Sequence, residues 1–430
     1  MGVEVSRLSN GLTVATETIP SIETVALGVW VKSGARNERD EEHGIAHLLE
    51  HMAFKGTGQR SAWDIASQIE DVGGEINAAT SVETTAFFAR VLAGDVPLAV
   101  DILSDILSDS RFDPGELERE QHVILQEIGA AYDTPDDIVF DRFTETAFRH
   151  QTIGRSILGT PETVKSFTSG QLRSFMDRQY GADRMVVVAA GAIKHDDFVR
   201  QVEARLGGFR PKAESVLPQY ANYVGGDYRE DRGLMDAQIL LGFEGRAYHV
   251  RDFYASQLLS MILGGGMSSR LFQEVREKRG LCYSVYAFHW GFSDTGVFGV
   301  HAATGKEDIA RLVPVILDEL QRAGENILPE ELDRARAQYR AGLLMSQESA
   351  ASRASQIARQ LMLYGRPIPM QELVERLSAI TTERLRDLAE RLFATKPTVA
   401  AIGPVGALPA FETIRESLAG PTPSVRRLAG

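Results

Sequence analysis

Cysteine is almost absent from this chain, which has a single one, Cys282, among its 430 residues. An internal disulfide is therefore excluded, and the composition is typical of a reducing compartment. Cys282 itself is expected to be a small core residue and not a nucleophile. No run of about eighteen apolar residues occurs, so we expect no membrane-spanning helix and no membrane partner. The first five residues show neither a cationic nor an apolar segment, so we expect no secretory signal and a cytoplasmic location.

The chain also has fewer basic than acidic residues. It contains 46 lysines and arginines and 59 aspartates and glutamates, which gives a formal net charge of −13. This balance argues against nucleic acid as a partner and favours cationic partners. The glycines at 264–266 are not followed by the Gly-Lys-Ser/Thr of a phosphate-binding loop, so nucleotide binding is not expected. The hydrophobic content of 43% and charged content of 24% are ordinary for a globular protein.

The most informative residues that are present form the pattern H-x-x-E-H: His47, Glu50 and His51. On a helix the two histidines, four residues apart, share one face, and Glu50 shares that face with His47. Two imidazoles can hold a zinc ion while the carboxylate acts as a base on water beside it. The order is the inverse of the common zincin helix and is typical of inverzincins.

A solvated helix face with two histidines beside a glutamate is the alternative interpretation. Against it, the flanking residues are all apolar: Ile45, Ala46, Leu48, Leu49, Met52 and Phe54. Such a helix is expected to be largely buried, and buried imidazoles and carboxylates need partners, which a metal can supply.

A catalytic zinc commonly has a third protein ligand. The helix expected to begin at residue 114 offers four carboxylates, Glu116, Glu118, Glu120 and Glu127. Glu127 lies among apolar residues, where a carboxylate is either ion-paired or bound to a metal.

The chain contains one internal repeat. Residues 168–178 return as 381–391, residues 114–119 return as 329–334, and residues 46–51 align with 256–261. In the second copy the two histidines and the glutamate are replaced, and the Glu120 and Glu127 positions become Ala335 and about Gly342. We therefore predict two similar domains, 1–210 with the metal chemistry and 226–430 without it. Their junction is expected in the proline- and glycine-containing stretch 209–226.

The pattern of the first half alternates between the two types of secondary structure. Besides the metal helix, strands are expected at 25–32 and 184–191 and as a hairpin within 75–92, and helices at 63–72, 96–107, 114–131 and 136–148. Helices grouped around a largely antiparallel sheet make an α+β fold.

These motifs resemble the pitrilysin and insulin-degrading-enzyme family of inverted-zincin peptidases, and most closely the bacterial relatives of mitochondrial processing peptidase. In that family the zinc-binding glutamate follows the second histidine by 76 positions, which is the spacing from His51 to Glu127. The resemblance implies one zinc per chain, held by His47, His51 and Glu127. It further implies an assisting role for Glu120, a substrate-pocket role for Phe54, and pairing of the peptide with an edge strand at Asn77-Ala78.

The second half carries Arg276 and Tyr283, seven residues apart, which resemble the family's arginine–tyrosine pair. There the arginine holds the substrate backbone and the tyrosine stabilises the oxyanion of the tetrahedral intermediate. Without the resemblance, a charged loop leading into a strand with a core tyrosine is the simpler interpretation. The nearby glycines at 264–266 are similar to a short form of the glycine-rich loop in the non-catalytic subunit of the processing peptidase.

Asp137 and Asp141, within Asp-Ile-Val-Phe-Asp, resemble a segment that contacts a substrate arginine in the mitochondrial enzyme. Two aspartates one helical turn apart can hold one guanidinium. The alternative is a solvated acidic face.

The sequence therefore predicts a zinc endopeptidase for short, extended, Arg-containing or presequence-like peptides, with Glu50 as the base. The resemblance implies half of a clamshell peptidase and a homodimer whose sites are completed in trans, because the heterodimeric processing enzymes divide these motifs between subunits. The alternative is a non-catalytic structural subunit with the same fold, like the core subunits of the cytochrome bc1 complex.

Overall fold

The computed structural model describes residues 2–211 and 219–418 of the chain. The chain forms two compact units, and each is assembled from three stretches of sequence. The first comprises residues 1–130, 155–219 and 342–368, and the second comprises residues 131–154, 220–341 and 369–430. Residues 212–218, the centre of the predicted junction, lie outside the described residues.

The first unit contains a six-stranded sheet. In spatial order its strands are β1 (Glu4–Arg7), β2 (Thr13–Thr18), β6 (Met185–Gly191), β3 (Thr24–Val31), β5 (Thr85–Leu92) and β4 (Glu75–Thr80). All neighbouring pairs are antiparallel except β2 and β6, which are parallel. Among the described strands β4 has one neighbour, β5, so it forms an edge of the sheet whose backbone groups can pair with another strand.

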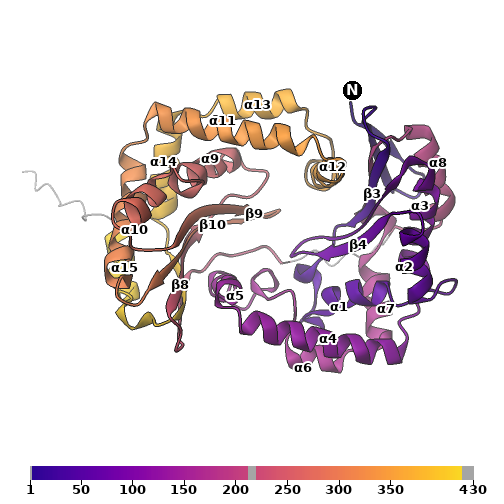
Figure 1. Cartoon of the computed structure of the whole chain (residues 1–430), viewed down its shortest axis with the longest axis horizontal. Helices are drawn as coiled ribbons and strands as arrows, with labels where there is room; N and C mark the ends of the chain where they lie inside the picture. Colours follow the sequence, from indigo (N-terminus) through magenta and orange to yellow (C-terminus); the bar gives the residue numbers. More distant parts are fainter. Residues whose placement is uncertain (1, 212–218, 419–430) are drawn as a thin grey trace, which may run out of the picture. The chain divides into compact units, whose positions relative to one another are not determined.

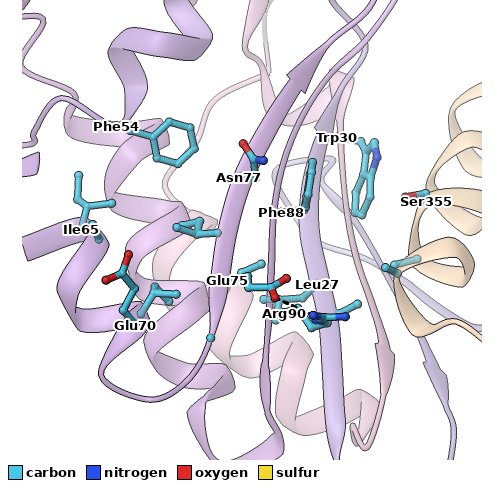
Figure 2. Close-up of a pocket in the computed structure, with 18 of the residues that line it drawn as sticks. Leu27, Trp30, Phe54, Ile65, Glu70, Glu75, Asn77, Phe88, Arg90 and Ser355 are labelled. Atoms are coloured by element: carbon cyan, nitrogen blue, oxygen red, sulfur yellow. Dashed lines mark hydrogen bonds and ion pairs between the residues drawn. The ribbon is translucent and has the colours of Figure 1, made fainter.

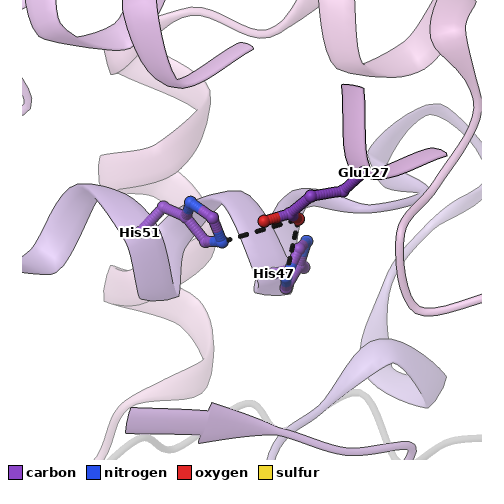
Figure 3. Close-up of side chains that lie close together, drawn as sticks. All are labelled: His47, His51 and Glu127. Carbon is purple, nitrogen blue, oxygen red and sulfur yellow. Dashed lines mark ion pairs between the residues drawn. The ribbon is translucent and has the colours of Figure 1, made fainter. Parts of the chain in front are cut away.

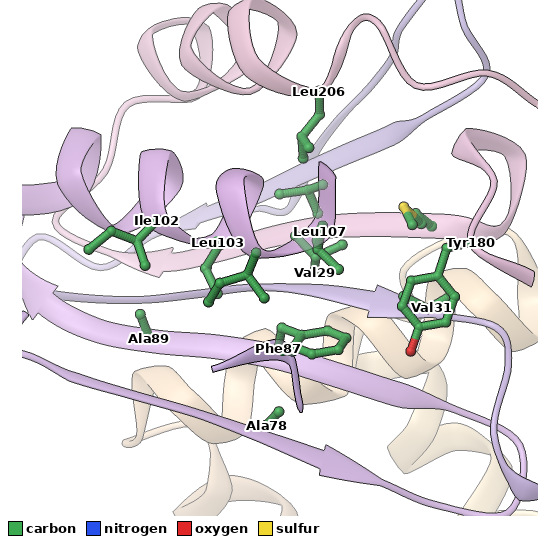
Figure 4. Close-up of a cluster of buried hydrophobic side chains, with 14 of the residues drawn as sticks. Val29, Val31, Ala78, Phe87, Ala89, Ile102, Leu103, Leu107, Tyr180 and Leu206 are labelled. Carbon is green, nitrogen blue, oxygen red and sulfur yellow. The ribbon is translucent and has the colours of Figure 1, made fainter. Parts of the chain in front are cut away.

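One face of this sheet packs against helices of the first half of the chain (Figure 1). The helices of this part are α1 (Ile45–Ala53), α2 (Ala62–Glu70), α3 (Val96–Asp109), α4 (Pro114–Tyr132), α6 (Pro161–Ser166), α7 (Ser169–Gln179) and α8 (His195–Leu206). Val29 and Phe87 from the sheet meet Leu103 and Leu107 of α3 in the core (Figure 4). This apolar layer fixes the position of α1, whose buried residues belong to the same cluster.

The opposite face of the sheet is covered by a helix from the second half of the chain, α12 (Ala350–Tyr364). Ala354 and Ile357 of α12 pack against Trp30 and Val188 in a second apolar cluster. Both faces of the central strands are thus covered, which explains why β3 is buried from Val25 to Val31 instead of alternating.

The second unit contains a five-stranded sheet. Its strands are, in order, β7 (Gly226–Asp231), β11 (Thr398–Gly403), β8 (Asp236–Glu244), β10 (Gly296–Gly305) and β9 (Ser284–Gly291), with β7 and β11 parallel and the other pairs antiparallel. Its helices include α9 (Phe253–Gly264), α10 (Ile309–Glu325), α11 (Pro329–Ser346), α13 (Met370–Ser378), α14 (Thr382–Phe393) and α15 (Phe411–Leu418). A helix from the first half, α5 (Pro135–Ala147), packs on β8 and β11 of this sheet.

The predicted α+β class, with two similar parts and mainly antiparallel sheets, is confirmed. The strands and helices expected in the first half are all present within a few residues of the predicted bounds. The division into domains 1–210 and 226–430 stays a prediction about the sequence repeat, because the compact units exchange α5 and α12 across it. In the described part of the chain, no helix combines the length and the apolar character that a membrane span requires.

Candidate metal centre

The helix that carries the H-x-x-E-H pattern, α1, is anchored by burial along one side. Its apolar residues are buried, whereas His47, Glu50 and His51 are partly exposed. At its N-terminus Gly44 has φ of +95°, and a Cβ there would lie 2.7 Å from the Cα of Gly159. Glycine is therefore required at this position on two counts, the left-handed backbone and the close approach.

The N-terminus of α1 is capped by the side chain of Glu38, which lies six residues before Gly44. Its carboxylate accepts hydrogen bonds from the backbone N–H groups of Gly44 (2.9 Å) and Ala46 (2.8 Å). Burial raises the pKa of Glu38 to about 8, although the two N–H donors and nearby Arg155 act in the opposite direction. The start of the helix is thus held by a buried group that belongs to no predicted site.

Three predicted ligands converge in the first unit (Figure 3). Oε2 of Glu127 lies 3.7 Å from Nε2 of His47 and 3.9 Å from Nε2 of His51, and the three ligand atoms all lie within 4.8 Å of one another. Burial lowers the pKa of His47 to about 4, with His51 acting in the same direction and Glu127 opposing it. His47 is therefore neutral at pH 7, the form in which imidazole binds a metal.

The separations of these atoms fit a zinc ion. A tetrahedral site with metal–ligand distances near 2.1 Å places ligand atoms about 3.4 Å apart. The two nitrogen–oxygen separations exceed that value by only a few tenths of an ångström. Two imidazole nitrogens and one carboxylate oxygen are also the donor set of many catalytic zinc sites, which leave a fourth position for water.

A fourth residue, the acidic Glu120, contacts one of the predicted ligands, His51. Glu120 is buried, with 6% of its surface exposed, and its Oε2 lies 3.0 Å from Nδ1 of His51. Its other oxygen, Oε1, lies 2.7 Å from Nζ of Lys55. A carboxylate that accepts from Nδ1 fixes the imidazole with Nε2 as the free ligand atom, which is the usual arrangement around zinc.

Glu50 lies on the same helix with a buried carboxylate oxygen, Oε2, that makes no hydrogen bond within the described residues. A buried oxygen without a partner is costly unless water or another group occupies the space beside it. The fully buried Tyr180 phenol is close enough to interact with this charge: burial raises its pKa, and Glu50 adds to the effect.

The predicted substrate residues of the first unit border a cavity of about 790 Å³ (Figure 2). Phe54, at the end of α1, and Asn77, on the edge strand β4, both line it. Ala78 turns its side chain to the opposite face from Asn77 and is buried in the core, so it offers only its backbone. The structure therefore brings Phe54 and the β4 edge to one cavity.

Arg276 and Tyr283 lie together in the second unit. The guanidinium carbon of Arg276 lies over two aromatic rings, 4.8 Å from the ring centroid of Phe272 and 5.4 Å from that of Tyr283. The segment Phe272–Glu277 is a π-helix, a rare conformation that often occurs at functional sites. Tyr283 is 82% exposed, so its hydroxyl is accessible.

Asp137 and Asp141 lie one turn apart on α5, also in the second unit, with Asp137 exposed and Asp141 half-buried.

Three residues around the candidate metal centre were not predicted from the sequence: Glu38, Lys55 and Tyr180. Lys55 follows His51 by four positions and could have been found by helical spacing. Glu38 lies only six positions before Gly44, but no regular period relates it to α1. Tyr180 comes from a distant part of the sequence.

Comparison with known proteins places this site in a family. Residues 13–161 match Insulinase (Peptidase family M16), and residues 166–339 match the Peptidase M16 inactive domain. A Rickettsia felis protein named "Uncharacterized zinc protease" is 39% identical over 402 residues, covering 93% of this chain and 97% of that protein. The Arabidopsis thaliana "Probable mitochondrial-processing peptidase subunit beta, mitochondrial" is 36% identical over 426 residues, covering 96% of this chain and 80% of that protein.

Solved structures share the fold. A chain of "Complex III2 from Candida albicans, Inz-5 bound" matches with a TM-score of 0.86 at 21% identity, covering 97% of this chain and 100% of that one. The family matches and the H-x-x-E-H helix are those of a metallopeptidase of the inverted-zincin class. The chain belongs to peptidase family M16, and the resemblance predicted from its sequence is confirmed.

Proposed function

We propose that this protein is a zinc-dependent endopeptidase that holds one zinc ion through His47, His51 and Glu127. The observation that carries the proposal is the convergence of Nε2 of both histidines with a carboxylate oxygen of Glu127. The relatives named as zinc proteases support zinc as the metal. Glu50, on the same helix face with an unpartnered oxygen, supports hydrolysis as the reaction.

The residues of the chain divide the chemistry among them. When bound, zinc supplies the Lewis acid that polarises the attacking water and the scissile carbonyl. Glu50 accepts the proton of the water and passes it to the leaving nitrogen. Glu120 keeps the His51 ring in its ligating orientation. In the homodimer that we propose, Tyr283 of the second copy donates a hydrogen bond to the oxyanion, and Arg276 of that copy holds the substrate backbone.

The substrate is an extended peptide that adds as a strand to β4. Among the described strands this edge strand pairs with β5 alone, so its other side can bind another strand by main-chain hydrogen bonds. Such pairing needs an unfolded segment, which limits the substrates to short or unstructured peptides. The processing peptidase among the relatives supports presequence-like segments.

A preference for arginine follows if Asp137 and Asp141 bind a guanidinium. The two carboxylates are one turn apart on α5, and a carboxylate pair is a good acceptor for the five donors of arginine. Mass-spectrometric mapping of cleavage sites in a diverse peptide pool checks this preference: arginine should be enriched two residues before the cut. A flat profile at that position would assign the two aspartates to a solvated surface.

The decisive test of the proposed function is the change Glu50→Gln. The amide keeps the shape of the side chain but cannot accept a proton, so zinc content should stay at one per chain while kcat falls to the background and KM changes little. The control is Glu118→Gln, an exposed change on α4, which should keep full activity. Substantial turnover by the zinc-loaded Glu50→Gln protein would contradict the assignment.

A second candidate is a structural subunit without activity, since the chain shares its fold with a chain of a complex III structure. A structural role does not need three converging ligand atoms and, among the described residues, a buried carboxylate oxygen of Glu50 without a hydrogen-bond partner. The zinc content of freshly purified protein distinguishes the two, because a stoichiometry near zero favours the structural subunit.

A further inference from the structure

The cavity beside β4 extends around both faces of the sheet edge. On one side it is lined by Phe54, Lys55, Ile65, Ile69 and Ile76, which we call the helix-side lobe. On the other side it is lined by Trp30, Phe88, Ala351, Ala354 and Ser355, which we call the α12-side lobe. Figure 2 shows Phe54 and Ile65 on one side of the β4 ribbon and Phe88, Trp30 and Ser355 on the other.

The register of the sheet assigns each residue to a face. Ile76 of β4 lies opposite Ala89 and packs against the core cluster on the helix side. Asn77 lies opposite Phe88, and directly opposed residues point to the same face. Phe88, in turn, lies opposite Gly28 of β3, so these residues form the surface that faces α12. The two lobes are therefore reached from alternate positions along the edge.

The α12-side lobe is apolar and is open to a large side chain. Trp30 is buried at 7% exposure, whereas the Phe88 ring is 37% exposed. Gly28 allows these rings to approach, because a Cβ there would lie 2.9 Å from Cβ of Phe88 and 3.0 Å from the Trp30 indole. The wall from α12 consists of two alanines and a serine, which leaves the space unfilled. The charges nearby, Glu75 and Arg90, are paired with each other at 2.7 Å.

We propose that the α12-side lobe binds large apolar side chains of the substrate strand at every second position. An extended peptide paired with β4 directs alternate side chains to opposite faces of the sheet. Side chains of one parity enter the lobe next to Phe54, and those of the other parity enter the space between Phe88 and α12. The lobe thus makes the substrate preference depend on a segment of the second half of the chain. This inference rests on the proposed function, because it assumes a peptide strand at β4.

The test uses the change Ala351→Phe in the full-length, zinc-loaded protein. Residue 351 is exposed and lines the lobe, so a phenylalanine there fills the space without entering the core. The matched control is Ser352→Phe, at the next exposed position of α12, which is not among the residues lining the cavity. A second variant, Phe88→Ala, removes the aromatic wall instead of filling the space.

The probes are ten-residue peptides of alanine and serine in which one phenylalanine is moved a position at a time, with kcat/KM measured and the cut located by mass spectrometry. For the unmodified protein and for Ser352→Phe, phenylalanine should raise kcat/KM at odd and at even positions of the peptide alike. In Ala351→Phe and Phe88→Ala, kcat/KM for the phenylalanine peptides should be about tenfold lower or more at alternate positions, and unchanged at the positions between them. Loss at every position, or at none, would overturn the proposal.

Peptide binding to the Glu50→Gln protein, measured as Kd by calorimetry, separates this inference from the proposed function. If no peptide is cut but Ala351→Phe weakens the binding of alternate-position peptides, the lobe stands and the peptidase assignment fails. If peptides are cut and the effect of Ala351→Phe does not alternate, the assignment stands and the lobe fails. If peptides neither bind nor are cut, both fail.

Discussion

Glu120 contacts two groups at once, and its second partner was not expected. Nζ of Lys55 lies 2.7 Å from one of its oxygens and Nδ1 of His51 lies 3.0 Å from the other, so the three side chains form a chain of polar contacts that ends at the imidazole of a predicted ligand. Because Glu120 is buried, loss of either partner leaves its carboxylate under-satisfied. We therefore infer that Lys55 is a positioning residue, which acts on the proposed metal site through Glu120.

We predict that Lys55→Met weakens zinc binding by about 10-fold to 100-fold, the usual cost of losing a group behind a metal ligand. Lys55→Arg, which keeps the charge, should recover most of the affinity. Competition with a chromophoric chelator measures Kd for zinc directly, without relying on turnover. The control is Lys165→Met, at an exposed position on α6. An unchanged Kd in Lys55→Met would make the contact with Glu120 incidental.

The spacing of the site residues could be predicted from the sequence, but the contacts behind them could not. His47, Glu50 and His51 share one helix, so their common face follows from the helical period alone. His51 and Glu120 are 69 positions apart, and their contact depends on how α4 packs against α1. Tyr180 reaches Glu50 from the end of another helix, α7, and no local pattern marks it.

At the scale of the element, the buried cap on α1 has a consequence for pH. Glu38 has a folded-state pKa raised from 4.5 to about 8, so the folded protein binds a proton more tightly than the unfolded chain. The stabilisation by this group is fully present below pH 4.5 and is lost as the pH rises through 8.

We predict that Glu38→Gln lowers the urea midpoint at pH 6. At that pH Glu38 is protonated, and both oxygens of the acid can still accept from the N–H groups of Gly44 and Ala46, whereas the amide has one acceptor oxygen and turns its NH₂ group toward the other N–H. Between pH 6 and pH 9 the urea midpoint of the unmodified protein should fall further than that of the variant, because glutamine does not ionise. Glu41→Gln, an exposed change nearby, serves as the control and should follow the unmodified protein. If the urea midpoints of Glu38→Gln and the unmodified protein change equally with pH, Glu38 does not ionise in this range.

The bounds of the helices and strands were more predictable from the sequence than the elements against which they pack. Apolar periodicity and turn residues predicted β3, β4, β5 and the helices of the first half because these signals are local. The packing of α12 on the first sheet was not predicted, since its alanine-rich face reads as an ordinary amphipathic helix. The packing of α5 on β8 and β11 of the second sheet was likewise not predicted.

At the scale of the whole molecule, Arg276 and Tyr283 lie in one unit and the metal ligands in the other. The family resemblance implies that in a homodimer each zinc site is completed by the arginine–tyrosine pair of the second copy. For a two-fold dimer the same exchange then occurs at both sites.

We predict that mixing Glu50→Gln chains with Tyr283→Phe chains restores activity, although each variant alone is inactive. About half of the randomly exchanged dimers are mixed, and each has one intact site, so roughly a quarter of the normal activity should return. Native mass spectrometry verifies that subunits have exchanged. If exchanged dimers stay inactive, the tyrosine does not act across the dimer.

The exchange of α5 and α12 between the two units also affects how this chain can be divided. A protein ending at residue 210 would keep the zinc ligands but lose α12, exposing Trp30, Val188 and the rest of the apolar surface beneath it. The remaining half would in turn lack α5 over β8 and β11. Neither half is therefore self-sufficient, and a gene split at the repeat boundary would have to yield two polypeptides that fold only together.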